Sequence, residues 1–114
     1  MYAGAFSECG NLKSVTLKGD SDISEYAFFR CDSLTVVKIG NGARSIGKAA
    51  FSGCSKLWSV TIPDSVNVIG SGAFSYCGLQ CVNYSGTSWE WDCIYIESNN
   101  DPLNRAEKYY NCFI

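Results

Sequence analysis

The sequence has seven cysteines among its 114 residues, and their side chains could take part in more kinds of chemistry than any others in the chain. A thiol can form a disulfide, bind a metal ion or act as a nucleophile. Four of them, Cys9, Cys31, Cys54 and Cys77, follow one another at intervals of 22 or 23 residues. Cysteine metal sites are usually built from pairs two to four residues apart with converging partners, so this long spacing does not indicate one. We expect these four to be small buried side chains.

The other three cysteines leave more alternatives. Cys77 and Cys81 are close in sequence, but strand alternation would place Cys81 on the outer face of a sheet while Cys77 points inward. A metal ion shared by this pair is therefore not expected. Cys93 and Cys112 could form a disulfide with each other or remain free. Because the total is odd, at least one thiol must stay unpaired.

The sequence offers few residues from which another kind of catalytic site could be built. The sequence contains no histidine, which removes every Ser-His and Cys-His nucleophile and the commonest metal ligand. The acidic residues are scattered, and none recurs at a fixed spacing. The glycine-rich stretches Gly40–Gly42 and Gly70–Gly72 lack the Gly-Lys-Ser/Thr spacing that grips a phosphate. We expect no enzymatic activity, no catalytic residue, no cofactor and no metal.

The periodic cysteines mark an internal repeat. Shifting the stretch Cys54–Cys77 back by 23 residues, and then by a further 22, superimposes the same apolar residues. An internal period of 20 to 50 residues is typical of a solenoid, in which each copy packs only on its neighbours. The superimposed positions are Leu12, Leu34 and Leu57; Val15, Val37 and Val60; Leu17, Ile39 and Ile62; Ile23, Ile46 and Ile69; Ala27, Ala50 and Ala73; and Phe28, Phe51 and Phe74.

Each copy contains three local patterns. Leu-x-x-Val-x-Leu/Ile ends in alternating residues, which predicts a parallel strand of about four residues. A turn follows at Gly40–Gly42 and at Pro63–Ser65. The pattern x-x-Ile-Gly predicts a second ladder of short strands. Between Ser24, Gly47 or Gly70 and the next cysteine we expect a short helical turn, because serine and glycine suit a helix N-cap.

The periodicity ends near Tyr84, so we divide the chain into repeats at 1–84 and a C-terminal cap at 85–114. In the cap we expect short helices at 89–93 and 102–107 and a closing strand at 108–112. Pro102 fits the first helical position, with Asp101 as N-cap. The cap aromatics are expected to form its core, rather than a platform for carbohydrate: Trp89, Trp91, Tyr95, Tyr109 and Tyr110.

Composition excludes several partners. The net charge is −2 and charges of both signs are dispersed, whereas nucleic-acid binders usually carry a basic stripe. No run of 18 apolar residues could span a membrane. The chain starts in the middle of a copy and shows no secretion signal, so we expect it to derive from a longer array. The uncovered first copy could support self-association.

The residues of the repeat resemble a known family. The unit C-x-x-L-x-x-V-x-I-P-x-x-V-x-x-I-G-x-x-A-F-x-x-C, complete at Cys54–Cys77, resembles the BspA-like leucine-rich repeats, and the match covers about 3–84. The first copy departs from it, with Ser24 in place of glycine and no proline. The segment from Tyr84 to Tyr109 is similar to the Y-G-T…W…N-x-x-L…A…Y ending of bacterial members. The resemblance implies a secreted or surface-attached protein that binds host proteins, other cells or matrix, without catalysis.

Binding is expected on the exposed, concave face of the main sheet. Trp58 is the only large aromatic expected there, and exposed aromatics are frequent where partners dock; it could instead lie flat over the sheet edge. We therefore expect a non-catalytic adhesion module, displayed extracellularly or at a bacterial cell surface, or alternatively a purely structural end of a longer array. The candidate binding residues are Ser14, Thr16, Val36, Lys38, Trp58, Ser59, Thr61, Cys81 and Asn83, flanked by Lys13, Thr35 and Gln80.

Overall fold

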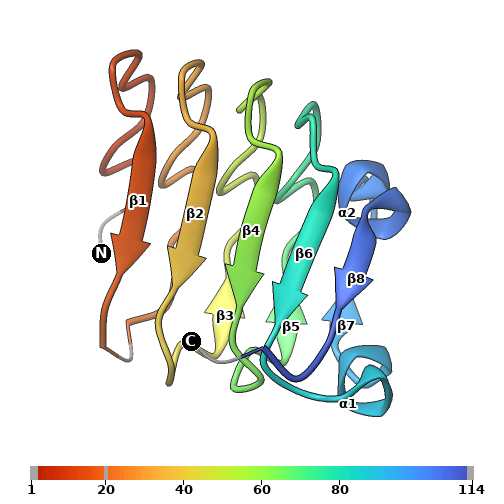
Figure 1. Cartoon of the computed structure of the whole chain (residues 1–114). Helices are drawn as coiled ribbons and strands as arrows, with labels where there is room; N and C mark the ends of the chain where they lie inside the picture. The colour runs from red at the N-terminus through yellow and green to blue at the C-terminus, as the bar shows by residue number, and fades with distance from the viewer. Residues whose placement is uncertain (1–2, 20, 113–114) are drawn as a thin grey trace.

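The computed structural model describes residues 3–19 and 21–112. Its main sheet is parallel, five-stranded and ordered β1-β2-β4-β6-β8, which runs across Figure 1 from the N-terminal to the C-terminal side. Parallel order is expected, because each copy must cross back before it adds its strand. The strands are β1 Ser14–Leu17, β2 Val36–Ile39, β4 Ser59–Ile62, β6 Cys81–Tyr84 and β8 Glu107–Tyr109.

A second parallel sheet lies behind the first (Figure 1). It contains β3 Ser45–Ile46, β5 Val68–Ile69 and β7 Tyr95–Ile96 in that order. Ile23 adds an isolated parallel bridge to Ile46. The second ladder predicted from the x-x-Ile-Gly pattern is confirmed, whereas β7 has no counterpart in the sequence prediction.

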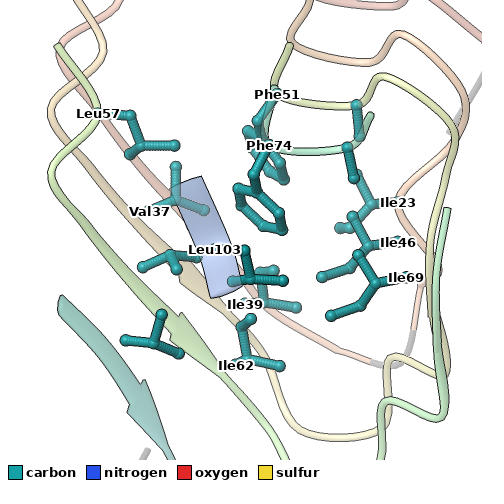
Figure 2. Packing of buried hydrophobic residues seen from close by; sticks show 14 of the residues in the cluster. Ile23, Val37, Ile39, Ile46, Phe51, Leu57, Ile62, Ile69, Phe74 and Leu103 are labelled. Carbon is teal, nitrogen blue, oxygen red and sulfur yellow. The ribbon is translucent and has the colours of Figure 1, made fainter. Parts of the chain in front are cut away.

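The register pairs equivalent positions of successive copies. Val15 pairs with Val37, Val37 with Val60, and Val60 with Val82. Equal spacing along the chain therefore becomes columns of identical side chains across the sheet. Figure 2 shows the interior, with Ile23, Ile46 and Ile69 in one such column opposite the strand residues.

Phenylalanine rings form the most regular column. The centroids of Phe6 and Phe28 are 5.3 Å apart, those of Phe28 and Phe51 5.2 Å, and those of Phe51 and Phe74 5.3 Å. Neighbouring ring planes differ by at most 14°, so the rings stack. Phe28, Phe51 and Phe74 are at most 1% exposed, and the predicted column of phenylalanines is confirmed.

The segments between the second ladder and the cysteine are turns, so the prediction of short helical turns there was wrong. Tyr26 and Arg30 have φ of 58° and 57°, in the left-handed region that a right-handed helix excludes. The Tyr26 N–H donates to the Lys48 carbonyl of the next copy at 2.9 Å. The Ala27 N–H, in contrast, donates to the Ser24 carbonyl within the turn at 3.2 Å, so alternate N–H groups bond between copies instead of forming a helix.

Gly47 and Gly70 are required by close packing rather than by a helix cap. A Cβ atom at Gly47 would lie 2.6 Å from the backbone nitrogen of Glu25, and one at Gly70 would lie 2.6 Å from that of Lys48. In both cases the obstacle is the backbone of the preceding copy. The glycine of the Ile-Gly motif is therefore required because the backbones of two neighbouring copies approach each other closely.

The C-terminal segment contains α1 Ser88–Asp92, β7, α2 Asp101–Arg105 and β8. Thr87 caps α1 in a capping box, since its side chain accepts from the Glu90 N–H and Glu90 accepts from the Thr87 N–H. The predicted helices at 89–93 and 102–107 each begin one residue too late; the first also ends one residue too late and the second two residues too late. The predicted strand at 108–112 is shifted, because β8 ends at Tyr109.

Asn100, not Asp101, is the N-cap of α2, so Pro102 stands at the second helical position instead of the first. The Asn100 side chain is fully buried and points away from the helix. Its Oδ1 accepts from the Phe74 N–H at 2.9 Å, and its Nδ2 donates to the carbonyl oxygens of Gly70 and Glu97 at 3.0 Å. In earlier copies the N–H of the stacked phenylalanine donates to a backbone carbonyl of the next copy. Asn100 supplies that acceptor where the copies end.

Lys108 occupies the inward column of β8, opposite Val82. Its Nζ donates to the carbonyl oxygens of Leu103, Asn104 and Ala106 at 2.6–2.9 Å, which satisfies the carbonyl end of α2. The ammonium also lies 5.8 Å from the centre of the Trp91 ring. Burial lowers the pKa of Lys108.

Only one of the five C-terminal aromatics predicted as core is buried. Trp91 is 7% exposed and packs edge-on against Tyr84, with ring centroids 5.1 Å apart. The other four lie at the surface because the C-terminal segment is thin. The part of it that the structure describes contains only short helices and two single strands, β7 and β8. The four exposed aromatics are Trp89, Tyr95, Tyr109 and Tyr110.

Candidate binding face

The outer face of the main sheet carries two columns of side chains, each contributed by the alternate residues of successive strands. We call this surface the outer face. The register brings together every residue predicted for these columns. The first column is Ser14, Val36, Ser59, Cys81 and Glu107, and the second is Thr16, Lys38, Thr61, Asn83 and Tyr109.

Exposure divides the predicted residues into two groups. Ser14, Thr16 and Lys38 are exposed, whereas Val36, Cys81 and Asn83 are half-buried. Ser59 and Thr61 were predicted to be exposed and are instead 6% and 8% exposed. They are short side chains in the middle strand, with longer neighbours on the strands at both sides. These two residues do not offer a surface to a partner.

β8 adds two residues that the sequence prediction omitted. Glu107 lies beside Cys81, and Tyr109 lies beside Asn83. The carboxylate of Glu107 raises the pKa of Tyr109. The repeat pattern does not reach β8, so only the alternation within Glu-Lys-Tyr could have signalled an outward pair.

Trp58 immediately precedes strand β4. Its N–H donates to the Thr35 carbonyl at 3.0 Å, and its carbonyl accepts from the Gln80 N–H at 2.9 Å. These bonds hold its backbone in the sheet, while 46% of the residue surface remains exposed. Tyr109 is exposed to 47%, so large exposed aromatics lie on β8 and immediately before β4.

A cleft opens where β1 and β2 end. Its volume is about 370 Å³, and its lining includes Thr16, Lys18, Lys38 and Asn41. The two lysines give this end of the outer face a positive charge. No ion pair joins them to an acidic residue in the described ranges 3–19 and 21–112.

The periodic cysteines have a structural role beyond filling space. The thiols of Cys31, Cys54 and Cys77 donate to the carbonyl oxygens of Phe6, Phe28 and Phe51 in the preceding copy at 3.0–3.1 Å. Burial raises the pKa of all three, to about 12 for Cys54. A thiol held in its neutral form is a poor nucleophile and a poor metal ligand.

All seven cysteines carry free thiols, so the disulfide considered for Cys93 and Cys112 is not formed. Cys81 lies on the outer face as predicted, and Cys77 donates inward. Among the described residues, no three or more Cys, Asp or Glu side chains converge as a metal site. The two described helices have five residues each and are too short to cross a membrane.

Copies of one parallel-strand unit, joined by turns around a common core, define a repeat protein with a sheet surface on one side. The family model described as "BspA type Leucine rich repeat region" matches residues 1–99, in six copies. The chain belongs to the BspA-type leucine-rich repeat family. No curated protein and no solved structure matches it. Membership of this family suggests a protein-interaction repeat module.

Proposed function

We propose that the chain is a non-catalytic module that binds a protein through the outer face and serves adhesion. The observation that carries this proposal is the continuous outer face of five parallel strands, with Tyr109 on it and Trp58 immediately before β4, both nearly half-exposed. Aromatic side chains held by a rigid backbone bind partners at a low cost in conformational entropy. The partner is a protein of a host or a neighbouring cell.

The same proposal includes the setting of the module. The copies form a solenoid, and residues 85–114 form its C-terminal cap. The protein to which they belong acts outside the cell, at a bacterial surface or after secretion. Support comes from the family and from Asn100 and Lys108, which satisfy backbone groups where the copies end.

Binding is tested on the immobilised chain with a panel of purified extracellular-matrix glycoproteins, using surface plasmon resonance. We expect at least one to bind at micromolar concentration and Trp58→Ala to weaken that binding by about tenfold or more. Trp89→Ala removes a more exposed indole from α1 and serves as the control, which should bind as the parent does.

Two results would contradict the proposal. One is that no glycoprotein of the panel is retained at micromolar levels. The other is that Trp58→Ala and Trp89→Ala bind equally well, because the outer face would then have no part in recognition. Circular dichroism of both variants checks that the fold is unchanged.

A second candidate function is structural. The closing role of Asn100 favours it, because this residue ends the hydrogen bonding between copies without offering a ligand site. In that case the segment stabilises a longer array whose recognition surface lies elsewhere. Deleting 85–114 from such an array would then lower its unfolding temperature and leave its ligand preference unchanged. A change in ligand preference would exclude this function.

A further inference from the structure

Each turn donates three backbone N–H groups to the copy that follows. In the copy that begins at Ser24, the donors are Tyr26, Phe28 and Arg30, with N···O distances of 2.7–2.9 Å. The copy that begins at Gly47 repeats the pattern with Ala49, Phe51 and Gly53 at 2.7–3.0 Å. The row of turns therefore has a donor edge, and this edge faces the C-terminal segment.

At the last copy this pattern is completed only in part. The Gly72 N–H donates to the Ser98 carbonyl, and the Phe74 N–H donates to Asn100 Oδ1, both at 2.9 Å. The third donor, the N–H of Tyr76, has no acceptor among the residues that the structure describes. The residue Tyr76 is 82% exposed and lines a cleft.

A cleft of about 610 Å³ lies at this position, between the last turn and α2. Its lining includes Lys48, Tyr76, Asn99, Asp101 and Arg105. In the described part of the chain, the charged ends of Lys48, Asp101 and Arg105 form no ion pair and no hydrogen bond. The cleft thus combines two cations, a carboxylate, an amide and an exposed phenol ring, all available to a ligand.

These groups recognise different parts of one class of molecule. Lysine, arginine and a backbone N–H bind a carboxylate through charge-assisted hydrogen bonds. The carboxylate of Asp101 and the amide of Asn99 accept hydrogen bonds from hydroxyl groups. The ring of Tyr76 offers a flat apolar surface with a polar end. We propose that this cleft binds an acidic saccharide, a sugar that carries both a carboxylate and neighbouring hydroxyls.

Other classes of ligand would leave some charged groups of the cleft without a suitable partner. A phosphate dianion would meet the cations and also the negative charge of Asp101, and it carries at most one hydroxyl for that carboxylate to accept from. A neutral sugar would leave Lys48 and Arg105 without a counter-charge. An acidic peptide would satisfy the cations but would leave Asp101 opposed to its carboxylates. Of these classes, only an acidic saccharide supplies a partner for each of Lys48, Arg105 and Asp101.

Titration of the isotope-labelled chain by NMR tests this site. The probe is trigalacturonic acid, and the comparison ligands are its methyl ester, which lacks the charge, and a short polyglutamate peptide. We expect saturable shifts of the Tyr76 amide and of the Arg105 side chain with the acid, and binding at least about tenfold weaker with the ester. The peptide should cause no saturable shift.

Variants separate the site from the surface charge as a whole. Arg105→Gln and Tyr76→Ala should each weaken binding of the acid by about tenfold, since each removes a contact at an exposed position. Arg44→Gln removes the same charge from another exposed arginine and should bind as the parent does. The proposal is overturned if the ester binds equally well, if only the peptide binds, if all three variants behave alike, or if no ligand binds up to about 10 mM.

Discussion

A single amide side chain accounts for how the copies end. Asn100 is fully buried, and its oxygen and nitrogen both bond to backbone groups of the last copy. A backbone turn would normally supply these partners, and an asparagine can imitate it because its side chain holds one acceptor and two donors. The stability of the last copy should therefore depend strongly on this residue.

Asn100→Ala should lower the free energy of unfolding by about 2–4 kcal/mol. The substitution leaves the N–H of Phe74 and the carbonyl of Gly70 without these partners inside the protein, and each buried unsatisfied group costs about 1–3 kcal/mol. Urea unfolding followed by circular dichroism measures the change. Asn104→Ala, at an exposed position of α2, is the control and should not lower the stability, because alanine favours a helix more than asparagine does. Equal effects would refute the role of Asn100.

The buried thiols predict a dependence of stability on pH. Burial raises the pKa of Cys54 to about 12, whereas in the unfolded chain this thiol titrates near its ordinary value of 9.0. Because the folded pKa is the higher one, the contribution is complete below pH 9.0 and is lost as the pH rises towards about 12. The unfolded state is the one that gains from deprotonation in this window.

As the pH rises from about 8 to about 10, deprotonation of Cys54 in the unfolded state should therefore lower the free energy of unfolding by about 1 kcal/mol. Cys54→Ala is less stable than the parent at neutral pH but should lose about 1 kcal/mol less over this interval. Urea titrations at the two pH values give the comparison. Cys93→Ala, at an exposed thiol, should follow the parent. Parallel behaviour of Cys54→Ala and the parent would show that Cys54 does not titrate in this way.

Among the elements, the stacked phenylalanines and the turns that carry them depend on each other. Alternate N–H groups of each turn donate within the turn and to the next copy, and the ring of each inner turn packs on two neighbours. An inner ring has a neighbour on both faces. Within residues 3–19 and 21–112, the first ring, Phe6, contacts a ring on one face only, and Phe6 is 44% exposed.

Phe51→Ala should lower the free energy of unfolding by about 3–5 kcal/mol, as is typical for a buried phenylalanine. Phe6→Ala removes the same atoms from a half-exposed position and should cost less than half as much. Thermal and urea unfolding measure both variants. A similar loss in the two would mean that the column does not contribute through burial between neighbours.

At the scale of the whole molecule, the two ends of the main sheet differ. At the C-terminal end, α2 and Lys108 lie beside β8 (Figure 1). At the other end, β1 pairs with β2 alone among the strands that the structure describes, and the inward residues Val15 and Leu17 are only half-buried. Exposed strand edges next to apolar surface favour pairing with another chain.

We therefore expect the chain to self-associate through β1 and Phe6. Light scattering across a concentration series should show a dimer, and Phe6→Glu should shift the chain to monomer, because a charge would be buried in the contact. Trp89→Glu introduces the same charge at an exposed aromatic of α1 and should leave the dimer intact. A monomeric parent at all concentrations would contradict this expectation.

The repeat itself determined most of the fold. Equal spacing of Leu, Val, Ile, Phe and Cys is enough to predict parallel strands in register, because only side-by-side copies bury such columns. The predicted columns of the outer face follow from the same spacing and match the observed register. Alternation within a strand also placed Cys81 outward correctly.

The tertiary structure alone decided what lies between and after the copies. Whether a six-residue segment forms a helix or a turn depends on whether its N–H groups find acceptors within the segment or in the next copy, and no local pattern states this. The burial of Ser59 and Thr61 depends on their position in the middle strand. Asn100 and Lys108 act on groups of other elements, so their roles exist only once the last copy is in place.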